Sequence, residues 1–243
     1  MIWFEFNGHR SSEYGILESL PLNLRAEKTT SIVEIPGSVP VFYEDGGFKN
    51  MKLTLNLGLT DISWENLDNI AAWLNGEGKL VFSNDPDRYY KAVCNGSYVG
   101  KRILNTMGKI PISFDILPYR YHDDTETIEL PIEEVGSDHV VDMSGVVMDQ
   151  TAIDYLPVFK LYGNGELGIY SFATGISLKA RNIEDYCIID VPRGIIYDRY
   201  NNIIMNETAS SVSKFILKPA GQRVLVDADV EQIELITNTA RWY

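Results

Sequence analysis

The side chains that could support catalysis are scattered along this chain. His9, His122 and His139 are isolated from the cysteines and from one another at the spacing of metal ligands. The sequence contains no zinc-protease, paired-cysteine, serine-hydrolase or Walker motif. Gly76-Glu77-Gly78 lacks the third glycine and the strand-before-helix order that phosphate binding requires. We therefore predict that the protein is not an enzyme and needs no cofactor or metal.

Two charged clusters remain as candidate binding sites. Carboxylates alternate at positions 227, 229 and 231 and could form a calcium-like cluster, although a solvated strand face or loop is the commoner arrangement. Asp85, Asp87 and Arg88 stand at a strand end beside Tyr89. They fit equally well a turn in which Arg88 pairs with a carboxylate and a contact between subunits.

Composition excludes several classes of function. The formal net charge of −13 disfavours tight binding to nucleic acid, which needs clustered Lys and Arg. Cys94 and Cys187 are too few for a disulfide framework and are expected to be buried. No apolar run approaches the roughly 20 residues that span a bilayer, and the first residues do not resemble a signal peptide. We expect no membrane association, and synthesis in the cytoplasm.

The elements that must position any site are clearest in the first half of the chain. Leu67, Ile70, Ala71 and Leu74 fall at helical spacing and predict a helix over 63–75, with Asp61 or Ser63 as cap and Gly76 at the left-handed end. Between Met51 and Leu59, apolar and polar residues alternate as in a half-buried strand. The first half is therefore predicted to be β-rich around one helix.

A long loop is predicted between strands 30–35 and 49–59, because Pro, Gly and Asp-Gly-Gly signals fill residues 36–48. Its apolar residues are unusual for a loop and are candidate contacts with a neighbouring subunit or a tube: Val39, Val41, Phe42 and Tyr43. The alternative is that the loop folds back onto its own domain.

The second half predicts an all-β sandwich. Periodicity fades between residues 123 and 142, so a domain boundary is expected near Glu134. Short strands then recur at the spacing of a sandwich. They are predicted at 158–162, 168–171, 176–179, 186–191, 195–198, 213–217, 222–226 and 233–237.

Three segments give the chain a resemblance to the phage distal tail proteins, the Dit family. Residues 64–92 combine the helix, a strand and the run Asp-Pro-Asp-Arg-Tyr-Tyr-Lys-Ala that in this family opens the next strand. Residues 4–16 resemble the N-terminal signature, and residues 233–243, which include Arg-Trp, resemble the C-terminal strand. One departure is Ser38, where many relatives carry an arginine after Pro-Gly.

The resemblance implies a mostly β fold. Residues 1–134 would form a tail-tube-like β-sandwich with one helix that builds a ring, and residues 135–243 a galectin-like β-sandwich. It further implies a homo-hexameric ring, single or double, at the tip of a long non-contractile phage or prophage tail, assembled in the bacterial cytoplasm. The ring would join the tail tube to a tail-associated lysin or fibre and leave a channel for DNA.

The alternative function is a carbohydrate-binding adsorption module in residues 135–243. The His-Asn-Arg and Trp-Glu-Arg set of galectins cannot be assembled from this sequence, and core packing is the expected role of Trp242. Phe159, Tyr186 and Phe215 lie in strand patterns that suggest burial. We therefore expect a scaffold without detectable saccharide affinity.

Overall fold

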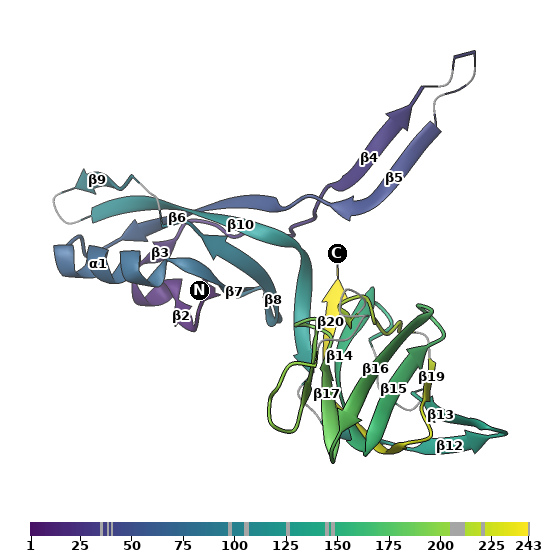
Figure 1. Cartoon of the computed structure of the whole chain (residues 1–243). Coiled ribbons are helices and arrows are strands. Elements are labelled where there is room, and N and C mark those ends of the chain that lie inside the picture. The colour runs from purple at the N-terminus through teal and green to yellow at the C-terminus, as the bar shows by residue number, and fades with distance from the viewer. Residues whose placement is uncertain are drawn as a thin grey trace. The chain divides into compact units, whose positions relative to one another are not determined.

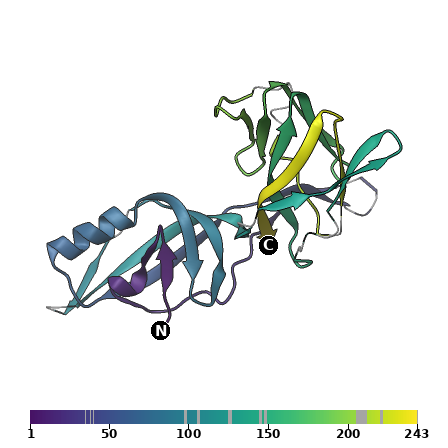
Figure 2. The same cartoon turned by 90° about the horizontal axis from the view of Figure 1, so that it is seen from below.

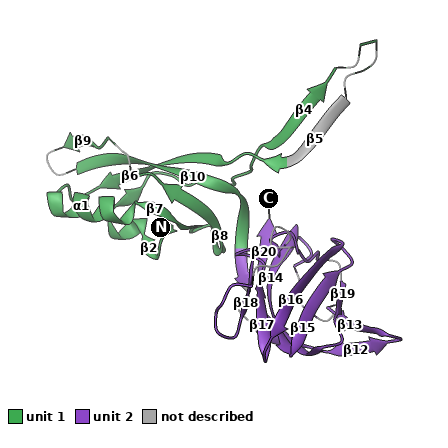
Figure 3. Cartoon of the chain, in the orientation of Figure 1, with its two compact units in different colours: residues 1–121, 243 green, residues 122–242 purple. Residues whose placement is uncertain are grey.

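The computed structural model divides into two compact units, residues 1–121 and residues 122–242 (Figure 3). The structure describes residues 1–34, 36–37, 39, 41–96, 99–104, 107–124, 127–143, 146, 149–204, 212–219 and 222–242. Within these ranges it describes the side chains of all residues except 41–46, 124 and 238.

In its described residues, the N-terminal unit is a β-fold with one α-helix (Figure 1 and Figure 2). Its elements are β1 (Phe4–Phe6), β2 (His9–Arg10), the 3-10 helix η1 (Ser11–Glu13), β3 (Ile16–Leu17), β4 (Lys28–Val33), β5 (Val41–Phe48), β6 (Met51–Leu59), α1 (Trp64–Trp73), β7 (Gly76–Phe82), β8 (Asp85–Cys94), β9 (Lys101–Leu104) and β10 (Met107–Asp124). The sheet runs β10-β8-β7-β1-β2, and β10 also pairs with β6 and β9, while β3 pairs with β6.

The predicted helix and strand are confirmed. Ser63 caps α1 by accepting a hydrogen bond from the Asn66 backbone N–H at 3.3 Å, and Gly76 has a φ of +81° where β7 begins. Trp73 is buried in the core, and its indole N–H donates to the Phe6 carbonyl at 2.8 Å. The alternation of β6 places Leu55, Leu57 and Leu59 in the same core.

The loop predicted over residues 36–48 is partly a strand. Residues 41–48 form β5, which pairs antiparallel with β4 in a separate two-stranded sheet, here called the hairpin. Figure 1 shows the hairpin extending beyond the rest of its unit. β5 was not predicted because it contains Asp-Gly-Gly, which usually signals a turn. The pairing of β4 with β5 is irregular there, with a register shift between the pairs formed by Lys28 and Thr30.

The C-terminal unit contains two antiparallel sheets around a second core. The elements are β11 (Ile128–Leu130), β12 (Ile132–Val135), β13 (Asp138–Asp142), β14 (Asp154–Gly163), β15 (Gly165–Ser171), β16 (Ile176–Ile183), β17 (Tyr186–Asp190), β18 (Ile195–Asp198), β19 (Arg223–Val226) and β20 (Val230–Trp242). One sheet runs β18-β17-β14-β20, with β11 on β20, and the other runs β12-β13-β19-β15-β16.

One strand predicted in this unit is wrong. Residues 213–217 form only an isolated bridge, in which Leu217 and Tyr155 exchange two backbone hydrogen bonds of 2.8 and 3.0 Å. Phe215 and Leu217 are nevertheless fully buried. The segment thus covers the core with its side chains without joining a ladder, a difference that apolar content alone does not reveal.

The division between the units lies before the boundary expected near Glu134. Residues 128–135 pair within the second unit, β11 with β20 and β12 with β13. Their polarity reflects exposed strand faces, since every residue of β12 except Ile132 is exposed. The loss of periodicity that suggested a boundary near Glu134 therefore came from exposed strands of the second unit.

Candidate functional site

The structure brings no catalytic or metal-binding constellation together within the residues it describes. His9 lies 3.5 Å from the Glu13 carboxylate, and His122 packs edge-on against the Trp242 ring. No group of three or more potential metal ligands occurs in the described ranges. Asp227 pairs with Lys179 Nζ at 3.3 Å. Asp227 thus forms a salt bridge with a lysine.

Both cysteines are buried inside their units. Burial raises the pKa of Cys94, against a smaller opposing effect of the Gly96 backbone, and burial raises the pKa of Cys187 to about 12. A thiol with a raised pKa holds little thiolate at neutral pH, so neither side chain is prepared for nucleophilic chemistry.

The Asp85 cluster is organised by an arginine that sequence reasoning missed. Asp85 Oδ2 accepts a hydrogen bond from Arg120 Nη1 at 3.0 Å, while Arg88 Nη1 lies 4.0 Å from the same oxygen. Asp87 is exposed. Arg88 thus lies near a carboxylate, but residues 85–88 belong to β8 and do not form the expected turn. Arg120 reaches Asp85 because β10 pairs with β8, with Arg120 opposite Tyr90.

This cluster borders a polar hollow of about 280 Å³ in the N-terminal unit, closed on another side by residues 21–24. Leu22 on its rim is 95 % exposed, whereas Tyr90 within it is buried. Burial raises the pKa of Tyr90, and the Arg120 charge opposes this effect. Two guanidinium groups around one carboxylate form a locally cationic surface in an acidic protein.

The end of the N-terminal unit at β9 and α1 exposes apolar and basic side chains. All four residues of β9 are exposed, with Ile103 at 62 % and Leu104 at 58 %. A hollow of about 170 Å³ lies between β9, the start of β10 and the helix, where Ile62 and Leu67 contribute to its wall. Trp64, the first residue of α1, is 81 % exposed.

The hairpin presents a second apolar surface. Ile32 and Val33 on β4 are 60 % and 50 % exposed, and Val39 in the turn is 78 % exposed. The side chains of Val41, Phe42 and Tyr43 lie outside the described residues, although their backbones pair with β4. The exposure of Val39 is the part of this sequence-based hypothesis that the structure describes directly.

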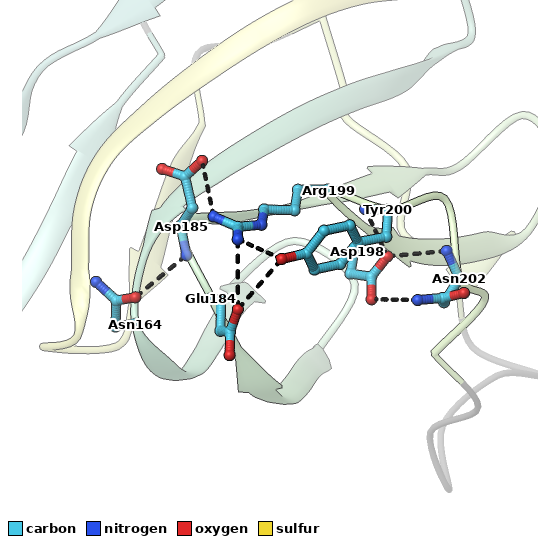
Figure 4. A network of polar contacts seen from close by, with 7 residues as sticks. All are labelled: Asn164, Glu184, Asp185, Asp198, Arg199, Tyr200 and Asn202. Atoms are coloured by element: carbon cyan, nitrogen blue, oxygen red, sulfur yellow. Dashed lines mark hydrogen bonds and ion pairs between the residues drawn. The ribbon is translucent and has the colours of Figure 1, made fainter.

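A polar network joins three turns of the C-terminal unit (Figure 4). The Asp198 carboxylate accepts hydrogen bonds from the backbone N–H groups of Tyr200 at 2.9 Å and Asn202 at 2.8 Å. Arg199 forms ion pairs with Glu184 at 3.5 Å and Asp185 at 3.8 Å, and its guanidinium also bonds the Tyr200 hydroxyl. These contacts fix the loop after β18 against the turn between β16 and β17.

Asp198 holds its charge in this network. Desolvation acts to raise the pKa of Asp198, but hydrogen bonds from the Asn202 side chain and from the Asn202 and Tyr200 backbones, with the Arg199 charge, bring it below its usual value. Tyr200 remains 60 % exposed. Sequence reasoning identified Asn201-Asn202 only as a turn and missed the network, because its partners come from separate turns.

Part of the chain is similar in sequence to phage tail proteins. Residues 9–116 match the family model described as the phage tail protein RIFT-related domain, which lies inside the N-terminal unit. No curated protein sequence matches the chain. No helix within the described ranges is long and apolar enough to cross a membrane.

The whole chain has the fold of a distal tail protein. It is similar to the solved structure of the SPP1 Dit protein (gp 19.1), with a TM-score of 0.72, 11 % sequence identity and complete coverage of both chains. The SPP1 protein is described as a paradigm of the hub adsorption apparatus in phages that infect Gram-positive bacteria. Both comparisons agree with the resemblance given by the sequence motifs, and the fold of the chain is that of a Dit protein. The mostly β fold prediction is confirmed.

Proposed function

We propose that the protein is the distal tail protein of a long-tailed, non-contractile phage or prophage, and that six copies form a hub ring at the tail tip. The observation that carries this proposal is the agreement of a tail-protein domain in residues 9–116 with a Dit fold over the whole chain. In this role the protein acts through the shape of its assembly and not through a catalysed reaction. Repeated contacts between copies close the ring and leave a channel for DNA.

The two units divide this task. The N-terminal unit forms the ring and stacks on the tail tube, with Val39, Val41, Phe42 and Tyr43 of the hairpin and Asp85, Asp87 and Arg88 as candidate contacts. The C-terminal unit supports a tail-associated lysin or fibre. The net charge of −13 on each copy gives the assembly an acidic surface that does not retain passing DNA.

The solution mass of the purified protein tests the ring. One copy has a mass of 27.4 kDa, so light scattering should show roughly 164 kDa for six copies, or twice that for a double ring. A monomer at every concentration and salt, also when tail tube is supplied as a template, would contradict the proposal.

Two shorter chains test the division of labour. A chain that ends at Asp124, where β10 ends, should fold and keep any tendency to form rings. Residues 122–243 should fold as a monomer. Ring formation by the C-terminal fragment alone would reverse the two roles.

A carbohydrate-binding role of the C-terminal unit is the second candidate, favoured by one observation. Tyr200 is an exposed ring beside Arg199 and Glu184, which is a common arrangement for stacking against sugars. These polar groups bond to one another, however, so a sugar would have to replace bonds that already exist. Titration with host cell-wall polysaccharide should show no saturation, whereas saturable binding that Tyr200→Ala abolishes would favour this second role.

A further inference from the structure

The hairpin is poorly supported by its own unit. Among the described strands, β4 and β5 pair only with each other. Its base is anchored by the Lys49–Glu27 ion pair at 2.9 Å and by Phe48, whose ring meets Tyr119 edge-on. An isolated two-stranded sheet is marginally stable in water, so the exposed edge and apolar residues of β4 need a further partner.

The opposite end of the same unit has a free strand edge. β9 pairs only with β10 among the described strands, and its outer edge is accompanied by exposed Ile103 and Leu104. The hollow beside α1 lies next to it, lined by Ile62 and Leu67. An unpaired edge beside an apolar hollow suits the addition of an extended strand, which gains main-chain hydrogen bonds and apolar burial together.

The two ends carry opposite charge. Residues 95–114, which include β9, contain Lys101, Arg102 and Lys109 and no acidic residue. The hairpin, residues 28–48, contains three acidic residues and one basic residue, Lys28, and Glu34, directly after β4, is exposed. The basic segment around β9 and the acidic hairpin are therefore electrostatically complementary.

Resting on the ring proposed above, we propose that the hairpin of one copy adds through β4 to the β9 edge of the next copy. Ile32, on one face of β4, would cover the hollow beside α1, and Glu34, which follows β4, would lie near Lys101. Figure 1 shows the hairpin and the β9 edge at opposite ends of the N-terminal unit. A donor at one end and an acceptor at the other make a head-to-tail interface, the type that generates rings.

Cross-linking tests this pairing directly. Ile32→Cys and Ile103→Cys are prepared as separate proteins, mixed and oxidised. Cross-linked dimers should form from the mixture, and a chain with both substitutions should give a ladder of up to six copies. The native Cys94 and Cys187 are 3 % and 0 % exposed and should not interfere. Ile16→Cys with Ile103→Cys is the matched control, because Ile16 is also 60 % exposed but lies on β3.

A charge reversal gives a second measurement. Lys101→Glu should weaken assembly roughly two- to five-fold, the range for a single exposed ion pair, and Glu34→Lys in the same chain should restore it. Lys52→Glu on β6 is the control with the same change of charge and should have no comparable effect.

The outcomes separate this pairing from the ring itself. A ring of normal mass without cross-links between positions 32 and 103, or with equal cross-linking of the control pair, would overturn the pairing and leave the ring intact. A protein that stays monomeric and never cross-links, also when tail tube is supplied, would overturn both. Selective cross-links together with rescue by Glu34→Lys would establish the hairpin and the β9 edge as the two sides of the interface.

Discussion

Replacement of Arg241, in the terminal Arg-Trp pair, tests how the C-terminal unit is held together. Arg241 Nε and Nη2 donate to the two oxygens of Asp154 at 2.5 and 2.6 Å, and the residues face each other on β20 and β14. The Asp154 side chain is only 5 % exposed. Arg241→Met removes this bidentate partner while keeping a long apolar side chain.

The expected cost follows from the carboxylate that remains. Breaking a buried ion pair costs about 3–5 kcal/mol, because the remaining charge stays desolvated. Lys218 Nζ lies 4.0 Å from Asp154 Oδ2 but is 45 % exposed, so it offsets little of this loss. We therefore expect a loss of about 3 kcal/mol in the free energy of unfolding of the C-terminal unit.

Urea unfolding combined with hydrogen exchange measures this loss. With a denaturant slope of roughly 2 kcal/mol per molar, the midpoint of the C-terminal unit should fall by about 1.5 M. Peptides from β14 and β20 should exchange faster, while those from β6 and β7 serve as an internal control. Asp154→Leu combined with Arg241→Met should recover much of the loss. A midpoint shift below about 0.5 M for Arg241→Met would refute the role given to the buried pair.

Three further predictions concern the helix cap, the thiols and the acidic limb of stability. Ser63→Ala should lower the stability of the N-terminal unit by about 1 kcal/mol through loss of the cap on Asn66, as thermal unfolding would show, and an unchanged midpoint would contradict it. Cys94 and Cys187 should react with a thiol reagent only after denaturation, and rapid labelling of the folded protein would show that either site opens. Lys179, by hydrogen bond and then charge, lowers the pKa of Glu166, so this stabilisation is complete above the unfolded pKa of about 4 and is lost as the pH falls through the lower folded value. Glu166→Gln should therefore reduce the loss of thermal stability between neutral pH and pH about 3, and an unchanged difference would argue against this linkage.

Local patterns predicted the elements whose causes are local. The helix follows from four apolar residues at helical spacing and a serine cap, and both are present in α1. Alternation in β6 was equally reliable, because burial of one strand face leaves a period of two in the sequence. Long-range resemblance, from the N-terminal signature to the terminal Arg-Trp, added the fold of the whole chain.

Features set by distant pairing were not predictable in the same way. β5 contains Asp-Gly-Gly, which signals a turn, but its pairing with β4 makes it a strand. Arg120 meets Asp85 only because of the register between β10 and β8. The network around Arg199 similarly needs turns from separate parts of the chain, and none of these partners leaves a spacing signal.

The hairpin also bears on the lifetime of an unassembled copy. A segment with open strand edges and little apolar support opens locally at low free-energy cost, and proteases cleave such openings before the rest of a domain unfolds. A bound neighbour raises that opening cost by mass action. Under the proposed pairing, docked copies would survive and solitary copies would be degraded, so the hairpin would also limit the accumulation of unassembled subunits.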